Sequence, residues 1–175
     1  MNNYSKIIIN EITKGFNSID NKKFEEMALN ISNSKNSIIG IGAGRMGYSL
    51  KGFIMRLNHL GYQAFMLGDT NLPKIKQGDI IIVNTSSGET PSIKLFTKQA
   101  ISYGAQVCVV TANPTSTIGA MADILLCYKD IGSKQLMKTY HEQLTWLIFD
   151  AIAMLIFDAS QKDKVWVENN HSILE

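Results

Sequence analysis

The chain has 175 residues, enough for one domain that buries roughly 70% of the surface of its unfolded chain. Hydrophobic residues make up 45% of it and charged residues 18%, which is typical of globular proteins and excludes a disordered or fibrous class. The formal net charge is only +2 and no basic stripe is present, so the composition argues against a nucleic-acid partner.

Targeting and membrane signals are also missing from the sequence. The N-terminus has no signal-peptide pattern, and the most apolar stretch, residues 144–157, contains Asp150 and is shorter than the roughly 20 residues of a membrane span. Cys108 and Cys127 stand in apolar runs without the spacing of a metal site or a disulfide framework, so we interpret them as small buried side chains. These features predict a cytoplasmic protein with no membrane partner.

Two amphipathic helices are expected within residues 1–33. The first has isoleucines and a phenylalanine at helical spacing, and Asp20 stands where it can cap the second. The period then changes, because residues 37–42 form a short apolar run that ends in glycines, as buried parallel strands do. A helix over residues 47–60 follows, and Gly61 occupies the position of a left-handed C-cap.

Strands and helices continue to alternate along the rest of the chain. Four further apolar runs are interpreted as strands, over residues 63–67, 79–84, 106–111 and 123–128. Thr90 and Pro91 indicate the start of a helix that ends at Tyr103, since threonine caps helices and proline suits the first helical position. A long terminal helix is expected over residues 133–159, followed by a polar tail.

Five short strands with helices before, between and after them predict an α/β fold, a three-layer αβα sandwich on a five-stranded parallel sheet. No linker or second domain is visible, so residues 1–175 are interpreted as a single domain. The terminal helix is apolar on nearly all sides and must therefore be covered. Its own domain can supply that cover, but a second subunit is the favoured alternative.

The first glycine-rich loop has the sequence GAGRMG at residues 42–47, between a strand and a helix. It fits the G-x-G-x-x-G fingerprint of dinucleotide sites, and Asp69 lies near the place of the ribose-binding acid. The motif is weak by itself, because any tight turn from strand to helix favours glycine. A small dinucleotide-binding protein therefore stays open as an alternative.

The second loop has the sequence TSSGET and opens a helix directly after the most apolar strand. Helix N-termini present free amide donors and a partial positive charge that attract phosphate, and small hydroxyl groups add donors. Turn formation and capping would explain the same residue types, but capping needs one hydroxyl and this loop offers more. The loop is therefore predicted to bind a phosphate group through Thr85, Ser86, Ser87, Gly88, Glu89 and Thr90.

These motifs in this order resemble those of the 6-phospho-3-hexuloisomerases, a group within the sugar isomerase (SIS) domain family. The similarity runs from about Ile38 to Glu175 and is most specific in three segments: FIMRLNHLG at 53–61, SSGET at 86–90 and HSILE at 171–175, which is similar to the family's HANLE ending. The resemblance implies an SIS-type, flavodoxin-like fold and conversion of 3-hexulose 6-phosphate to fructose 6-phosphate. It also implies that no metal or redox cofactor is used, and that the protein is a homotetramer or homodimer.

The chain departs from the family's usual sequence at several positions. Met46 stands where the first loop usually has serine, and Ser86 where the second loop usually has glycine. The family segment M-G-T-x-F-E-Q reads MKTYHEQ here, with Lys138 in place of the glycine and His141 in place of the phenylalanine. These departures leave the exact substrate open, and a non-catalytic SIS module that senses a sugar phosphate stays an alternative.

Moving a carbonyl group between adjacent sugar carbons needs a base that lifts a proton from one carbon and returns it to the next. Glu142 matches the family's glutamate and is interpreted as this catalytic base, the alternative being an exposed helix glutamate. His171 and His59 match the family's tail and helix histidines and are the candidates for exchanging a proton with an oxygen. His141 has no counterpart and is expected at the surface.

The arginines and the loop carboxylate have distinct expected roles. Arg45 follows Gly44 at the tip of the first loop, where its guanidinium group can pair with phosphate or sugar oxygens. Arg56 lies in an otherwise apolar helix, where we expect it to make a structural ion pair, with a place in the pocket as the alternative. The Glu89 carboxylate is expected to turn away from a bound phosphate, toward an arginine, because two anions repel each other.

Overall fold

The structure, a computed structural model, describes residues 3–171. Its strands are β1 (Ile38–Gly42), β2 (Ala64–Met66), β3 (Ile80–Asn84), β4 (Gln106–Thr111) and β5 (Ile124–Cys127). Its helices are α1 (Tyr4–Phe16), α2 (Asn21–Ser32), α3 (Gly44–His59), α4 (Pro91–Ser102), α5 (Thr139–Ala159) and α6 (Lys164–Asn169), with a short 3₁₀ helix η1 (Gly119–Met121). The predicted strands are all confirmed to within about one residue at each end.

The five strands form one sheet in the order β2-β1-β3-β4-β5, and every neighbouring pair is parallel. The chain moves outward from β1 in both directions, so β1 and β3 flank a topological switch point, where ligands of open α/β sheets bind. Gly42 at the end of β1 pairs with Asn84 at the end of β3. The two glycine-rich loops therefore leave the sheet side by side.

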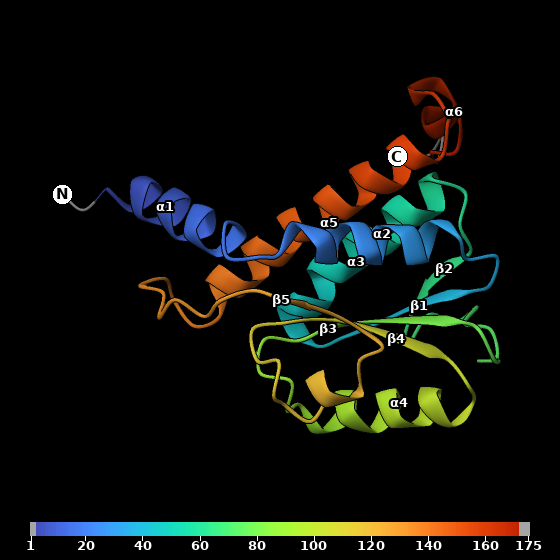
Figure 1. Cartoon of the computed structure of the whole chain (residues 1–175), viewed down its shortest axis with the longest axis horizontal. Helices are drawn as coiled ribbons and strands as arrows, with labels where there is room; N and C mark the ends of the chain where they lie inside the picture. Colours follow the sequence, from blue (N-terminus) through green and yellow to red (C-terminus); the bar gives the residue numbers. More distant parts are fainter. Residues whose placement is uncertain (1–2, 172–175) are drawn as a thin grey trace.

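Helices cover both faces of the sheet, which confirms the predicted three-layer sandwich (Figure 1). Successive strand side chains point to opposite faces, so Ile80 and Ile82 pack into the core beneath α2, α3 and α5, whereas Ile81 and Val83 pack into the core on the α4 side. Cys108 belongs to the first core and burial raises the pKa of its thiol to about 12. Within residues 3–171, no helix is long and apolar enough to cross a bilayer.

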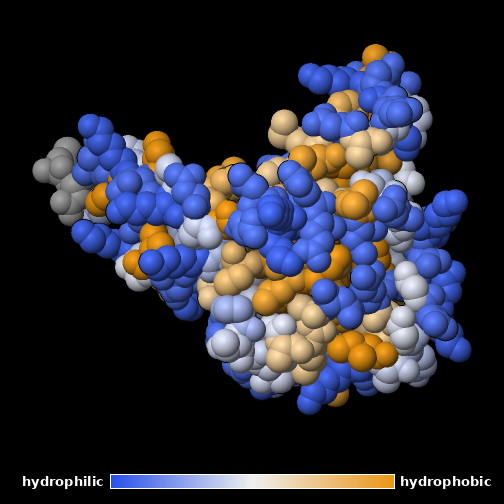
Figure 2. Space-filling view, in the orientation of Figure 1, coloured by the Kyte–Doolittle hydropathy of each residue, from blue (hydrophilic) through white to orange (hydrophobic). Residues whose placement is uncertain are grey.

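The first helix, α1, lies along α5 and then stands out from the body of the molecule (Figure 1). Hydrophobic side chains are scattered among hydrophilic ones on this projecting arm (Figure 2). Ile9 in α1 is 65% exposed, although its neighbours in the helix include residues that pack on the core. The arm thus offers an apolar surface that the described chain does not cover.

The predicted long terminal helix is wrong at its start, since α5 begins only at Thr139. Residues 133–138 form a loop that is tied to α1 through the buried carboxylate of Glu11. This carboxylate accepts hydrogen bonds from Ser133 Oγ at 2.7 Å, the Lys134 backbone N–H at 2.8 Å and Gln135 Nε2 at 3.0 Å. Partial desolvation raises the pKa of Glu11, but these hydrogen bonds outweigh it and lower the pKa overall.

The expected apolar surface of the terminal helix is covered on one side only. Leu144, Ile148 and Ile152 are fully buried against the rest of the chain. In contrast, Trp146 is 48% exposed and Leu147 is 44% exposed on the other side. Packing within the chain therefore explains the buried apolar residues of α5. The exposed side chains of Trp146 and Leu147 remain as a hydrophobic strip at the surface.

The segment predicted as a polar tail contains the short helix α6, which folds back onto the end of α3. Asp163 caps α6 by accepting from the Trp166 N–H at 2.7 Å, and the Lys162 ammonium group lies 3.4 Å from the centre of the Trp166 ring. Asn170 Nδ2 donates to the carbonyl oxygen of His59 at 3.2 Å. His171 is the last residue of the described chain, so the remainder of the HSILE ending lies outside it.

Candidate active site

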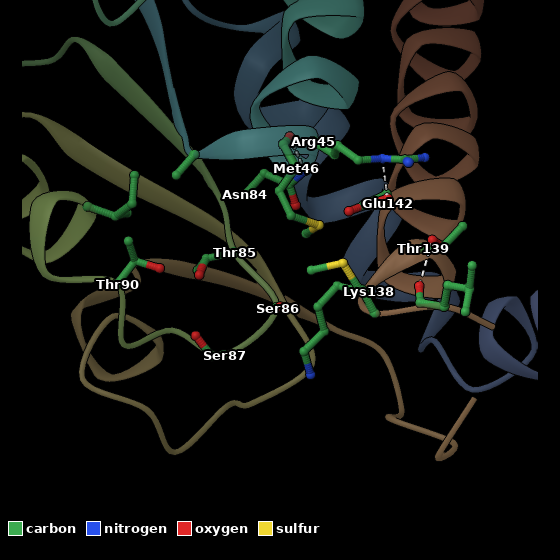
Figure 3. A pocket seen from close by; sticks show the side chains of 14 residues that line it. Arg45, Met46, Asn84, Thr85, Ser86, Ser87, Thr90, Lys138, Thr139 and Glu142 are labelled. Atoms are coloured by element: carbon green, nitrogen blue, oxygen red, sulfur yellow. Dashed lines mark hydrogen bonds and ion pairs between the residues drawn. The ribbon is translucent and has the colours of Figure 1, made fainter. Parts of the chain in front are cut away.

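A cavity of about 530 Å³ lies at the carboxyl ends of β1 and β3, at the switch point of the sheet (Figure 3). Its lining comes from the first glycine-rich loop, from the end of β3 and the second loop, and from the segment that leads into α5. The lining residues are Ala43, Arg45, Met46, Asn84, Thr85, Ser86, Ser87, Thr90, Ile93, Leu136, Met137, Lys138, Thr139 and Glu142. The two predicted loops thus share one cavity with the predicted base.

The glycines of the first loop bring α3 close against the end of β1. A Cβ atom on Gly42 would lie 2.9 Å from the Gly47 Cα, and Gly44 has a φ of +54°. Asp69, the candidate ribose ligand, instead accepts a hydrogen bond from the Met66 N–H at 2.8 Å in the turn after β2. Close packing and a local turn therefore account for the residues that suggested a dinucleotide site.

The second loop is shaped by hydrogen bonds between its own residues. Thr85 Oγ1 accepts from the Gly88 N–H at 3.1 Å, and Ser87 Oγ accepts from the Glu89 N–H at 3.3 Å. Gly88 has a φ of +69°, and a Cβ atom there would collide with the Ser116 side chain. Thr90 precedes α4, but its side chain does not cap the helix, so its hydroxyl group makes no hydrogen bond to the first turn of α4.

The structure places four of the six predicted loop residues in the cavity lining, and Gly88 and Glu89 are not among them. As expected, the Glu89 carboxylate turns outward, but its partner is a lysine and not an arginine. It lies 2.9 Å from Lys94 Nζ and accepts from the Thr117 N–H at 2.7 Å and the Thr117 hydroxyl at 2.9 Å. The bond from the Thr117 backbone N–H, with those from Lys94 and the Thr117 hydroxyl, lowers the pKa of Glu89 to about 2.

Glu142 forms an ion pair with Arg45 at the mouth of the cavity, with 2.6 Å between Arg45 Nε and Glu142 Oε2 (Figure 3). The Arg45 side chain is 67% exposed, whereas that of Glu142 is 14% exposed. Glu142 sits in the first turn of α5 and Arg45 in the first turn of α3. The pair therefore joins two helix starts and orients the carboxylate of the predicted base.

A buried polar network, which sequence reasoning did not select, supports this arrangement. Asn84 Nδ2 donates to the Met46 carbonyl oxygen at 2.8 Å and to Ser49 Oγ at 3.0 Å, and the hydroxyl groups of Ser49 and Thr145 lie 3.0 Å apart. Asn84 Oδ1 has no partner among the described residues, and Asn84 lines the cavity. This oxygen is therefore a buried acceptor without a hydrogen bond beside the cavity.

His59 and His171 lie next to each other, with 4.7 Å between the ring centroids, at the end of α3 that is remote from the cavity. The helix has 16 residues, so its two ends are separated by roughly 20 Å. The structure thus brings Glu142 together with the loop that was predicted to bind phosphate. It places both predicted catalytic histidines elsewhere in the same chain.

The expectation that His141 lies at the surface is wrong, because the residue is only 4% exposed. Its Nδ1 lies 3.2 Å from the Tyr128 hydroxyl group, and its Nε2 lies 3.7 Å from Asp130 Oδ2. Burial lowers the pKa of His141, against the opposing effect of Asp130. The sequence contained a signal for this burial, since His141 stands where the family segment that the chain resembles has an apolar phenylalanine.

Arg56 is exposed and forms no ion pair with the residues that the structure describes, so the expected structural pair is absent from that part of the chain. It does not line the cavity at the switch point either. Arg56 lies instead beside a second hollow between α3 and the C-terminal segment.

Comparison with known proteins agrees with the fold and the motifs. The model of the SIS domain matches residues 30–153. A 3-hexulose-6-phosphate isomerase of Bacillus subtilis is 32% identical over 184 aligned positions, which span 98% of this chain and 97% of the Bacillus protein. One solved structure, of a hypothetical protein, has a TM-score of 0.90 and 29% identity, and the match covers 98% of this chain and 95% of that one.

A second solved structure supports the same fold. It is a hypothetical protein of Methanococcus jannaschii for which a molecular function of 3-hexulose-6-phosphate isomerase was inferred. Its TM-score is 0.84 at 24% identity, over 98% of this chain and 99% of that one. The sequence, the sheet order and these matches together assign the chain to the SIS domain family.

Proposed function

We propose that this chain is a 3-hexulose-6-phosphate isomerase, which interconverts 3-hexulose 6-phosphate and fructose 6-phosphate. The observation that carries the proposal is the pairing, in one cavity, of a hydroxyl-rich loop at a helix start with the carboxylate of Glu142. The Bacillus relative of that name, which matches over nearly the whole length of both chains, supports the choice of substrate.

The phosphoryl group of the substrate binds at the second loop. Ser86, Ser87 and Thr90 line the cavity there, and the free amide groups at the start of α4 face the same end of the sheet. The outward turn of Glu89 removes the one carboxylate in the loop that would repel a phosphate. Gly88 and Glu89 then act by shaping the loop, while Gly44 sets the turn that presents Arg45.

Glu142 moves the proton. Its carboxylate takes the proton from C2 of 3-hexulose 6-phosphate while O3 gains a proton, which leaves an enediol across C2 and C3. Glu142 then returns its proton to C3 while O2 loses its hydroxyl proton, which gives the C2 carbonyl group of fructose 6-phosphate. The sugar has the same overall oxidation state before and after, so no redox cofactor enters the step. General-base assistance of this kind contributes on the order of 10² to 10⁴ in rate. Arg45 holds the carboxylate in place and lies near the oxygens that gain charge.

The second proton transfer, from O2 to O3, is assigned to a histidine from another subunit. The described chain keeps His59 and His171 roughly 20 Å from the cavity, so neither reaches Glu142 in the same chain. A groove of about 630 Å³ adjoins the cavity, because Arg45 and Glu142 line both. Most of its other lining residues are apolar side chains of α1, α3 and α5, including Ile9, Tyr48 and Leu147.

This groove supports a homodimer or homotetramer in which a second copy covers the apolar strip and supplies the partner subunit's His171. His171 is exposed, whereas His59 is buried in its own chain and would act by positioning the His171 ring. The enzyme is further assigned to the cytoplasm, since both cysteines are free thiols, as is usual in reducing compartments. A sensing module without catalysis is the second candidate, favoured by Met46, whose side chain occupies the cavity where related sequences carry a serine hydroxyl.

A measurement of turnover distinguishes an isomerase from a sensing module without catalysis. Purified protein is mixed with 3-hexulose 6-phosphate and the fructose 6-phosphate formed is measured by a coupled assay. We expect turnover by the wild type and a loss of at least tenfold in kcat for Glu142→Gln, because the amide cannot accept the carbon-bound proton. Glu25→Gln, on the exposed face of α2, is the matched control. Binding of the sugar phosphate without turnover would favour the sensor.

A further inference from the structure

One cation that lines the cavity, Lys138, has no ion-pair partner among residues 3–171. Lys138 occupies the N-cap position of α5 and lines the cavity together with Ser86 and Ser87. Its ammonium group makes no ion pair or hydrogen bond with the residues that the structure describes. In Figure 3 the Lys138 side chain extends from the start of α5 toward the loop of Ser86 and Ser87, away from the Arg45–Glu142 pair.

The other charges around the cavity are already matched. Arg45 is paired with Glu142, and Glu89 is paired with Lys94 outside the cavity. Lys138 therefore leaves the lining with one uncompensated positive charge, on the wall that faces the hydroxyl-rich loop. A phosphate monoester carries a charge of about −1.5 to −2 at neutral pH, which neutral hydroxyl and amide donors do not balance.

We propose that Lys138 is a phosphate ligand of this chain, which binds the phosphoryl group of the substrate from the wall opposite the loop of residues 85–90. This inference rests on the proposed function, because it takes a sugar phosphate as the ligand. A hydrogen bond between an ammonium group and a phosphate oxygen is charge-assisted and roughly twice as strong as one between neutral groups. Lys138 thus adds the ionic contact that the loop itself lacks.

Calorimetry and steady-state kinetics test this role with three variants. Lys138→Met keeps the aliphatic stem but removes the charge, Lys138→Arg keeps the charge, and Lys134→Met removes a charge in the same loop outside the cavity. We expect the Kd of Lys138→Met for fructose 6-phosphate to rise about tenfold, which is the effect of losing one charged hydrogen bond. Lys138→Arg and Lys134→Met should stay within about threefold of the wild type.

The kinetic readout distinguishes a ligand from a structural residue. The phosphoryl group does not react, so Lys138→Met should raise KM about tenfold and leave kcat within about twofold. Binding of unphosphorylated fructose should be equally weak in the wild type and the variant. A fall in kcat with unchanged KM, or equal Kd values for fructose 6-phosphate, would overturn the role of Lys138.

The outcomes also separate this inference from the proposed function. Turnover by the wild type with no effect of Lys138→Met refutes the lysine as a ligand and leaves the isomerase intact. Absence of turnover, with binding of fructose 6-phosphate that Lys138→Met weakens, refutes the isomerase and supports the ligand. If the wild type does not bind fructose 6-phosphate or inorganic phosphate, both are refuted.

Discussion

The two ends of α3 differ in what they offer to catalysis. At the N-terminal end, Arg45, Glu142 and the second loop surround a cavity at the switch point of the sheet. At the C-terminal end, His59 and His171 lie in contact beneath the short helix α6. One end holds the proposed anion site and the proposed base, and the other holds imidazole groups, which are the side chains best suited to exchange protons near neutral pH.

The two ends of α3 also differ in the contacts that hold them in place. The cavity end rests on the buried network of Asn84, Ser49 and Thr145, which links β3, α3 and α5. The histidine end is held by partly exposed contacts, such as the stacking of Lys162 on Trp166 and one hydrogen bond from Asn170. The polar network that supports the cavity end therefore lies within one chain.

The largest effect is expected from Gly88→Ala at the cavity end. The left-handed φ of +69° and the contact with Ser116 leave no room for a methyl group, so the phosphate loop must shift. We expect at least a tenfold rise in the Kd for fructose 6-phosphate. Gly132→Ala is the matched control, because Gly132 has a φ of +62° in open space. Equal losses in the two variants would show that backbone strain alone, and not the loop, is responsible.

A charged residue on the exposed apolar strip of α5 is expected to prevent a second subunit from covering the groove. Leu147→Glu places a charge in the groove beside Glu142 and should shift the protein toward monomers in sedimentation velocity, with about a tenfold loss of turnover. Leu95→Glu, on the exposed face of α4, should change neither property. Full activity of a monomeric Leu147→Glu protein would contradict the shared site.

The smallest effect concerns the pH dependence of stability. Burial holds the pKa of His141 below its usual 6.5, so the unfolded chain binds this proton first as the pH falls. Stability is therefore lost as the pH falls below 6.5, by at most about 1.4 kcal/mol per pH unit. The carboxylate of Glu11 has a lowered pKa and acts in a separate window, below its usual 4.5.

Chemical denaturation at pH 7.0 and 5.5 measures this effect. His141→Phe, which installs the side chain of related sequences, should flatten the dependence in that interval. The same slope in both proteins would assign the pH dependence to other groups. Because His141 precedes Glu142, the variant also shows whether the pH dependence of turnover arises from this buried ring.

Much of the fold could be predicted from the sequence because its signals are local. Short apolar runs such as residues 79–84 indicate buried strands, and Thr90-Pro91 marks a helix start that the structure confirms. The start of α5 could not be predicted in this way. Residues 133–138 are held as a loop by Glu11, more than 100 positions earlier, and no local pattern reports such a contact.

The candidate site was predictable to a similar extent. The two loops follow from motif and topology, since residues at the carboxyl ends of β1 and β3 meet at the switch point. Glu142 was selected only through the resemblance to the SIS family, because nothing local in the sequence places the start of α5 beside these loops. The separation of His59 from Arg45 was also readable, because a helix of this length sets its two ends far apart. The burial of Asn84 Oδ1 and the free charge of Lys138 depend on three elements that meet only in the folded chain.

A mixing experiment tests most directly whether the two ends of α3 cooperate across subunits. Glu142→Gln is co-expressed with a second chain that carries His59→Ala and His171→Ala, and each is also purified alone. If a site combines Glu142 of one subunit with histidines of another, the inactive parents should give mixed oligomers with about a quarter of wild-type turnover, since random pairing restores one site in four. Mixed oligomers as inactive as their parents would contradict the shared site.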